Sequence, residues 1–157
     1  PGSRPTWSWG AGRSVARVAV VGAAGRSTRL GLGPGVSKAA LSVGGVPIIE
    51  RLMRWLGSSG VGRVVVVSRS EHRAILQQKL DRPFGPEWII DDRSAGWVAS
   101  LEAGLSVVVD DDEVIVPAYD NIYSAPPVWT RPGVDAVFTY ARWTDPRPSS
   151  DGPISHR

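Results

Sequence analysis

The loop that starts at Gly22 holds the residues of this chain best suited to chemistry. It reads GAAGRSTRLG and directly follows the apolar run 17–21. Glycines let backbone N–H groups approach an anion closely, Arg29 can hold phosphate oxygens through two parallel hydrogen bonds, and Lys38 can place a point charge on another phosphate. One of these cations can hold a leaving pyrophosphate while the other follows the reacting phosphorus. This division of tasks suits transfer of a nucleotidyl group.

Lysine is rare in this chain, so its placement is informative. The 18 basic residues are sixteen arginines and two lysines, Lys38 and Lys79. The first lysine stands directly before the segment AALSVGGVPIIERL, in which a glycine pair precedes a predicted helix. This position favours a functional role for Lys38 over that of a solvated loop residue.

The spacing argues against two other phosphate-binding loops. The pattern G-x-x-x-x-G-K-[ST] is absent, so the loop is no Walker loop. In a dinucleotide site the glycines open a helix at once, whereas here the next helix is predicted only from Pro47 and the next strand near Val64. An NADP-binding reductase, with Arg69 near the 2′-phosphate, is the remaining alternative of this kind, and it requires a helix that starts at Gly25.

Strand and helix patterns alternate along the chain. Short β-branched apolar runs predict buried strands at 17–21, 63–68, 87–90, 114–117 and 134–141, and apolar periodicity predicts helices at 47–56, 71–80 and 97–108. We expect the long loop between the first strand and the first helix to run to about Gly45. The alternation predicts an α/β fold, a three-layer α/β/α sandwich around a mostly parallel, Rossmann-like sheet. Ligands of such sheets bind beyond the carboxyl ends of the strands, where the glycine-rich loop begins.

Two helices carry more specific expectations. In the helix 71–80 we expect His72 to be exposed, because its neighbours are charged. In the helix 97–108 one side is apolar and is expected to pack on the sheet. The residues on that side are Val98, Leu101, Leu105 and Val108.

Composition narrows the class of protein. The 157 residues suffice for one domain, and the absence of cysteine excludes disulfides and thiolate metal sites. Two histidines argue against a histidine metal cage or a Ser-His-Asp triad. The net charge of +3 is spread along the chain, which argues against a nucleic-acid partner.

No apolar run reaches the roughly 20 residues of a membrane span, and residues 1–15 lack the apolar region of a signal peptide. We therefore expect a cytoplasmic protein without a membrane partner.

Three regions are expected along the chain. Residues 1–15 are rich in Pro, Gly, Ser and Arg and are predicted to form a poorly ordered arm, residues 16–146 form the domain, and residues 147–157 form an irregular tail.

The motifs together resemble a known family. GAAGRSTRLG, Lys38, AALSVGGVPIIERLMRWL and GVGRVVVVS are similar to the nucleotidyltransferases of the GT-A-like fold, and most of all to the molybdenum-cofactor guanylyltransferase-like (MobA-like) NTP transferases. The segment SAGWVASLEAGL, from Ser94 to Leu105, is similar to the family segment that contacts the nucleoside. The segment VIVPAYDN, from Val114 to Asn121, takes the place of the strand that ends in the family's metal-binding aspartate.

The resemblance implies an activity and a set of site residues. The activity is Mg²⁺-dependent transfer of an NMP unit from an NTP, GTP among them, to a small phosphorylated acceptor such as a molybdopterin, a sugar phosphate or a phospho-alcohol, with release of pyrophosphate. Arg29 and Lys38 are implied to act on the phosphates as catalytic residues, and Asp120 to bind the metal. The residues implied to bind the nucleotide are Ala23, Ala24, Gly25, Arg26, Ser27, Thr28, Gly96 and Ser100.

The sequence also departs from the family pattern. Ser37 stands where proline often precedes the lysine, and Tyr119 replaces the glycine that normally precedes the metal aspartate. The family continues beyond the end of this chain with a segment that supplies a second acidic metal ligand, so we expect a C-terminally truncated domain. Asp145 and Asp151 are the late candidates for that ligand. A truncated, inactive homologue that binds nucleotide or a protein partner is therefore the second hypothesis.

Overall fold

The computed structural model describes residues 16–27, 30–31, 33, 35–80, 85–93, 96–110, 112–121, 123, 125 and 127. The predicted arm 1–15, the predicted strand 134–141 and the predicted tail 147–157 lie outside these residues. Thr28 and Arg29 lie outside them as well. Within the described part of the chain, no helix combines the length and apolar character that crossing a membrane requires.

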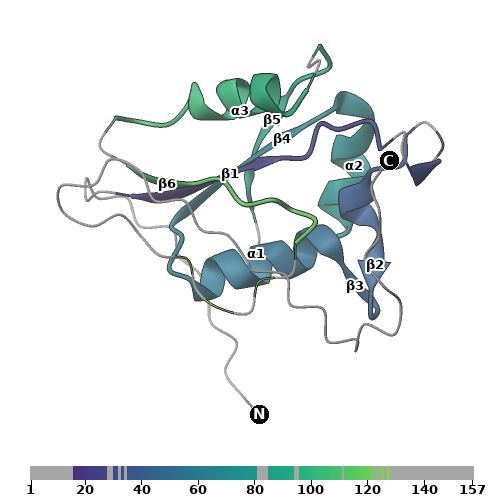
Figure 1. Ribbon diagram of the computed structural model, residues 1–157, viewed down its shortest axis with the longest axis horizontal. Coiled ribbons are helices and arrows are strands. Elements are labelled where there is room, and N and C mark those ends of the chain that lie inside the picture. The colour runs from purple at the N-terminus through teal and green to yellow at the C-terminus, as the bar shows by residue number, and fades with distance from the viewer. Residues whose placement is uncertain are drawn as a thin grey trace, which may run out of the picture. The chain divides into compact units, whose positions relative to one another are not determined.

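A four-stranded parallel sheet forms the centre of the fold (Figure 1). Its strands are β1 (Arg17–Gly22), β4 (Arg63–Ser68), β5 (Glu87–Ile90) and β6 (Glu113–Ile115), in the spatial order β5-β4-β1-β6. The valine-rich strands β1 and β4 pair along their length and are almost completely buried. Runs of β-branched residues suit a strand that is covered on both faces, so the prediction of a parallel sheet is confirmed.

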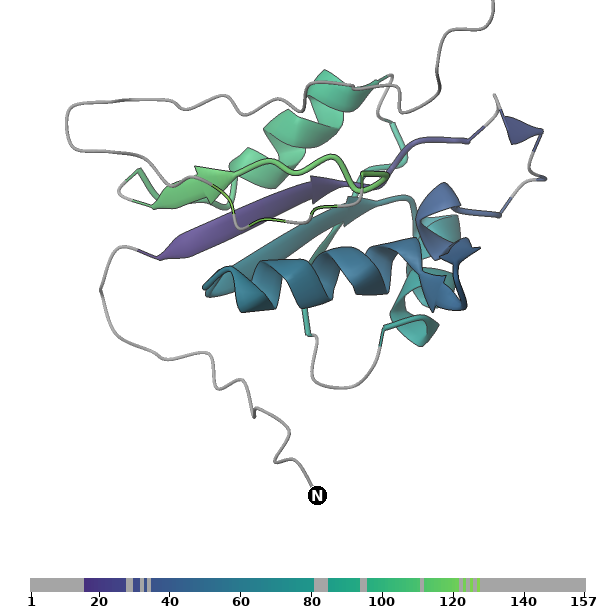
Figure 2. The ribbon, with the colours of Figure 1, turned by 60° about the horizontal axis from the view of Figure 1, so that its bottom comes forward.

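Three helices cover the two faces of this sheet. The helices α1 (Ile48–Ser58) and α2 (Ser70–Gln78) lie on one side and α3 (Trp97–Leu105) on the other (Figure 2). The chain moves outward from β1 through β4 to β5 and then returns past β1 to β6. Right-handed crossovers place the helices of outward and returning steps on opposite faces. The three-layer α/β/α prediction is therefore confirmed.

A proline precedes the helix α1 and a glycine turns the chain after it. Pro47 precedes its first residue as the N-cap, and the buried side chains include Leu52 and Leu56. The sequence predicted a helix over 47–56, but the helix continues through Gly57 to Ser58. Gly60 has a φ of 76°, the left-handed conformation that glycine adopts at little cost, so this residue turns the chain away.

The loop between β1 and α1 contains more structure than the sequence predicted. A 3-10 helix, η2 (Lys38–Ala40), is followed by a hairpin of β2 (Ser42–Val43) and β3 (Val46–Pro47). Gly44 and Gly45 have φ values of 59° and 78°, and two successive positive φ angles are the requirement of a tight two-residue hairpin turn. The expectation of an irregular loop to Gly45 was therefore wrong for this part.

The side of α3 that packs on the sheet differs from the predicted one. Val98 is 62% exposed and Leu105 39% exposed, whereas Ser100 and Gly104 are buried. A Cβ atom added to Gly104 would lie 2.3 Å from Cγ1 of Val20, so the helix approaches the sheet through its small residues. Two members of the predicted face, Leu101 and Val108, are partly buried against the core.

His72 also differs from expectation, because its side chain is buried. It is 1% exposed on the side of α2 that carries the buried Leu76 one helical turn later. This helix contacts β5 and η2. Charged neighbours in the sequence suggested an exposed position, but Glu71 and Arg73 occupy the exposed side and leave His72 on the inner one.

Candidate functional site

The candidate site lies where the strand order reverses. β1 is flanked by β4 on one side and β6 on the other, although β6 follows it by some ninety residues. The loops after β1 and β6 therefore leave the same edge of the sheet side by side and diverge. In open α/β sheets this switch point forms a crevice that binds ligands. The loop after β1 begins at Ala23, and the segment after β6 carries Asp120.

The glycine-rich loop is tied to the fold at both ends of its described part. The N–H of Ala23 donates to the carbonyl oxygen of Val67 at 2.7 Å, which extends the pairing of β1 with β4. Ser27 has a φ of 54°, and its hydroxyl oxygen accepts the N–H of Lys38 at 3.1 Å. This hydrogen bond closes the loop onto η2 and so fixes the start of the lysine-bearing turn.

Lys38, Tyr119 and Asp120 form one charged cluster at the switch point. The ammonium group of Lys38 makes an ion pair with Asp120 and lies 5.7 Å from the centre of the Tyr119 ring. The hydrogen bond to Asp120 raises the pKa of the lysine above its ordinary value. The two charged side chains are 30% and 40% exposed, so both remain accessible to an incoming anion or cation. The structure thus brings together two residues that are 82 positions apart in the sequence.

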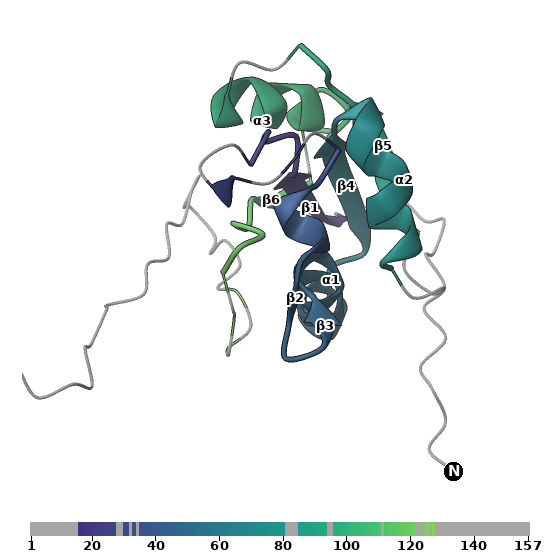
Figure 3. The same ribbon diagram turned by 90° about the vertical axis from the view of Figure 1, so that its right-hand side faces the viewer.

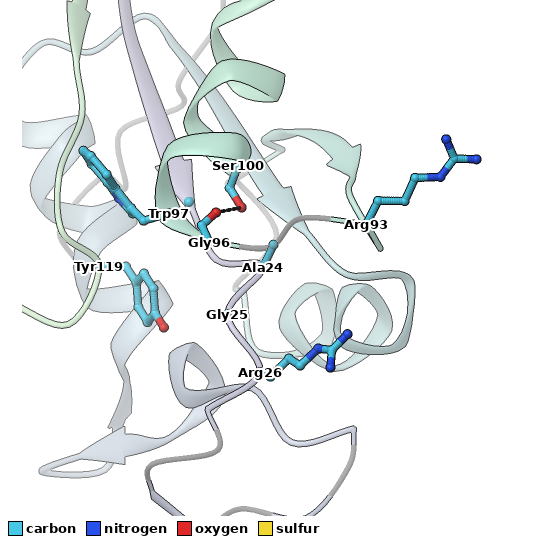
Figure 4. A pocket seen from close by; sticks show the side chains of 9 residues that line it. Ala24, Gly25, Arg26, Arg93, Gly96, Trp97, Ser100 and Tyr119 are labelled. Carbon is cyan, nitrogen blue, oxygen red and sulfur yellow. Dashed lines mark hydrogen bonds between the residues drawn. The ribbon is translucent and has the colours of Figure 1, made fainter.

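A cavity of about 600 Å³ opens beside this cluster. Figure 4 shows Trp97 and Tyr119 on one side of the loop residue Gly25, and Arg26 and Arg93 on the other. The cavity therefore has an aromatic side and a cationic side. The described residues that line it are Gly22, Ala24, Gly25, Arg26, Arg93, Gly96, Trp97, Ser100 and Tyr119.

The start of α3 contributes polar backbone to the cavity. Gly96 is the N-cap, and the hydroxyl of the buried Ser100 donates to its carbonyl oxygen at 3.4 Å. The first N–H groups of a helix lack partners within the helix and carry a partial positive charge. The indole of Trp97 packs over Gly22, where an added Cβ would lie 3.6 Å from its ring. The helix start and the glycine-rich loop therefore form adjacent walls.

The structure gathers most of the predicted site residues. Ala24, Gly25, Arg26, Gly96 and Ser100 line the cavity. Other predicted residues lie outside the lining in different settings. Ala23 is buried with its N–H bonded to Val67, the Ser27 hydroxyl accepts the N–H of Lys38, and Lys38 lies beside Tyr119 and pairs with Asp120. The predicted roles of Arg29 and Thr28 concern residues outside the described ones.

Arg93 and Tyr119 were not predicted to line the site. Arg93 follows β5 and Tyr119 follows β6, so both leave the carboxyl edge of the sheet. The sequence signal that was available for both residues is their position directly after a predicted strand. A search for charged or aromatic residues at such positions would have identified them. Burial raises the pKa of the Tyr119 hydroxyl, so the group stays protonated and can donate a hydrogen bond at neutral pH.

The residues present partly fit a magnesium ion. Among the described residues, no group of three or more acidic or histidine side chains could hold a metal, and Asp120 is the carboxylate of the cluster. Magnesium is often held by one or two carboxylates together with substrate phosphates and waters. A single exposed aspartate beside a lysine is compatible with that mode of binding.

The chain belongs to the family of MobA-like NTP transferase domains. Residues 19–131 match this family, and the matched range includes the glycine-rich loop, Lys38, the start of α3 and Asp120. A comparison with curated proteins gave no match. The reductase alternative required a helix from Gly25, whereas the helix after β1 starts at Ile48.

Solved structures share the fold. A nucleotidyl transferase from Methanothermobacter is 28% identical, with a TM-score of 0.53 over 69% of this chain and 52% of that one. A UDP-glucose pyrophosphorylase from Acinetobacter is 18% identical, with a TM-score of 0.57 over 67% and 46%. The CTP:phosphocholine cytidylyltransferase from Streptococcus pneumoniae is 22% identical, with a TM-score of 0.52 over 68% and 46%. The chain thus spans about half the length of the structures that it matches.

Proposed function

We propose that the chain carries the nucleotide-binding part of a Mg²⁺-dependent nucleotidyltransferase, which moves an NMP unit from an NTP to a small phosphorylated acceptor. The observation that carries this proposal is the convergence of Lys38 and Asp120 at the switch point of a MobA-like domain, next to a cavity of about 600 Å³. That volume lies in the range of small-molecule sites. Molybdopterin, a sugar phosphate or a phospho-alcohol would be the acceptor.

The lining of the cavity supports different roles for its two sides. The backbone of Ala24 and Gly25 would lie along the nucleotide, with Arg26 and Lys38 near its phosphates. Gly96 and Ser100, at the start of α3, would lie near the ribose and base. The names of the similar structures support this class of ligand, since they include a CTP-dependent cytidylyltransferase and a UDP-glucose pyrophosphorylase. Guanine is the base that the MobA resemblance favours.

The proposed reaction needs no covalent enzyme intermediate. An oxygen of the acceptor phosphate forms a bond to the α-phosphorus of the NTP, and the bond from that phosphorus to the bridging oxygen breaks. The electron pair leaves with pyrophosphate. Lys38 would stabilise the negative charge that develops on the phosphate oxygens, and the loop would hold the α-phosphorus in line with its attacker.

Magnesium would supply charge neutralisation on the phosphate oxygens when bound. Asp120 is the described residue that would hold it, and to do so its carboxylate must exchange Lys38 for the metal. Lys38 would then be free to bind a phosphate. The ion pair seen here therefore keeps both side chains close to the positions that the proposed complex requires.

An inactive homologue that binds nucleotide is the second candidate. One observation favours it: Asp120, the predicted metal ligand, makes an ion pair with Lys38 in the structure. Nucleotide binding is common to both candidates. Release of pyrophosphate distinguishes them.

Calorimetric titration with each of the four NTPs and Mg²⁺ tests the proposal. We expect one NTP to bind with micromolar affinity, and we expect Lys38→Ala to weaken that binding roughly tenfold to a hundredfold, because charged hydrogen bonds contribute about 1.5–3 kcal/mol. Lys79→Ala is the matched control, since it removes the same charge from the exposed end of α2.

Three outcomes are informative. Binding lost in Lys38→Ala but kept in Lys79→Ala supports the site, and pyrophosphate release with a phosphorylated acceptor then supports the transferase. Binding without release in a screen of phosphorylated acceptors favours the inactive homologue. Failure of all four NTPs to bind the wild-type chain would contradict both candidates as nucleotide binders.

A further inference from the structure

An aromatic contact links α1 to the segment that follows β6. The rings of Trp55 and Tyr123 stack with their centres 4.2 Å apart and their planes 20° from parallel. The indole N–H of Trp55 also donates to the carbonyl oxygen of Ala125 at 2.8 Å. Figure 3 shows the segment after β6 leaving the sheet and passing α1. Stacking and hydrogen bonding thus fix this segment at a second point, away from the sheet.

The same tyrosine is bonded to the turn that carries Asp120. The hydroxyl of Tyr123 donates to the carbonyl oxygen of Ala118 at 2.9 Å. That residue also accepts the N–H of Asn121 at 3.2 Å, which closes the turn around Tyr119 and Asp120. A continuous path of contacts therefore runs from Trp55 through Tyr123 to the aspartate that pairs with Lys38.

The turn has few other attachments in the described structure. Strand β6 pairs with β1 only as far as Ile115, so Asp120 lies five residues beyond the last paired position. Tyr119 is half-buried and Asp120 is exposed. A short segment without strand pairing has access to many backbone conformations unless side chains restrain it. Within the turn, the ion pair of Asp120 with Lys38 reaches η2. The next described restraint along the chain is the Trp55–Tyr123 contact, which ties the segment after the turn to α1.

We propose that Trp55 and Tyr123 are positioning residues, which hold the turn 118–121 so that Asp120 faces Lys38 and the cavity. This inference rests on the proposed function for what Asp120 does, but the positioning itself is a property of the fold. Neither ring of the pair is among the described residues that line the cavity. We also expect loss of the pair to disturb Asp120 more than it disturbs the core.

Hydrogen exchange of the amides of 119–121 tests the positioning without any ligand. We expect Tyr123→Ala and Trp55→Ala to raise their exchange rates about tenfold or more, because one stacking contact and one hydrogen bond together restrain the turn. Tyr123→Phe keeps the stack but removes the hydrogen bond to Ala118, so it should give exchange rates between those of the wild type and Tyr123→Ala. Leu80→Ala is the control, since it truncates a buried side chain at the end of α2, beside the opposite edge of the sheet. Unchanged exchange in Tyr123→Ala, or an equal rise in Leu80→Ala, would overturn the proposal.

Titration with Mg²⁺ and the NTP that binds the wild type tests the consequence for the site. We expect Tyr123→Ala to weaken binding about tenfold while Leu80→Ala retains wild-type affinity in the folded protein, which a general loss of stability would not produce. Wild-type affinity in Tyr123→Ala would reject a role in the site. If the wild type binds no NTP, the proposed function fails, and the exchange experiment alone decides the positioning.

Discussion

The imidazole of His72 is 1% exposed, and burial lowers its pKa below the ordinary value of about 6.5. Glu71 opposes this shift and Arg69 adds to it, but desolvation is the largest cause. The unfolded chain therefore binds a proton near pH 6.5, whereas His72 in the folded chain stays unprotonated until the pH is lower. The free energy of unfolding should fall as the pH drops from about 6.5 toward the lower folded pKa, with a slope of up to about 1.4 kcal/mol per pH unit.

The free energy of unfolding in urea between pH 7.5 and 5.5 measures this slope. His72→Gln should flatten it, His156→Gln should not, and an equal slope in His72→Gln would show that another group is responsible.

The close approach of α3 to the sheet depends on a single small residue. A Cβ atom at position 104 would lie 2.3 Å from Cγ1 of Val20 and 3.0 Å from Cγ2 of Val67, and neither branched side chain can move far in a packed strand. Overpacking costs about 1–3 kcal/mol, and the better helix propensity of alanine offsets up to about 1 kcal/mol of it. Gly104→Ala should therefore lower the free energy of unfolding by about 1–2 kcal/mol in denaturant titrations, and Ala103→Gly should report the propensity contribution at the adjacent position of the same helix. A more stable Gly104→Ala variant would mean that the helix can move away from the sheet.

The same helix shows what sequence patterns could and could not predict. Strands β1, β4 and β5 and the existence of all three helices followed from local periodicity, because burial on a sheet imposes a repeat on the chain. The packed face of α3 was missed because small residues, rather than large apolar ones, make its closest contact. The hairpin β2–β3 was missed because its strands have two residues each. Lys38 was predicted from the loop chemistry and the rarity of lysine, and Asp120 from the family resemblance. Arg93 and the lining role of Tyr119 depend on how distant loops meet, which no local repeat encodes.

At the scale of the whole molecule, the proposed ligand would join segments that the chain supplies separately. The cavity draws its lining from the loop after β1, the residue Arg93 after β5, the start of α3 and the segment after β6. A ligand that contacts all of these segments binds the folded chain but not the unfolded one. By mass action it therefore stabilises the folded state against unfolding. At a concentration one hundred times its dissociation constant, the gain is about 2.7 kcal/mol.

This gain should appear as a rise in the unfolding temperature. For a chain of this size, about 2.7 kcal/mol corresponds to an increase of about 5–10 °C when Mg²⁺ and the bound NTP are added together. Lys38→Ala should lose most of this increase at the same concentration, and Lys79→Ala should keep it, because only the first lysine reaches Asp120 and the switch point. Sodium sulfate at equal ionic strength controls for general stabilisation by anions. If sulfate raises the unfolding temperature as much as the nucleotide does, or if Lys38→Ala responds like the wild type, the ligand does not act through the loop and the turn that meet at this edge of the sheet.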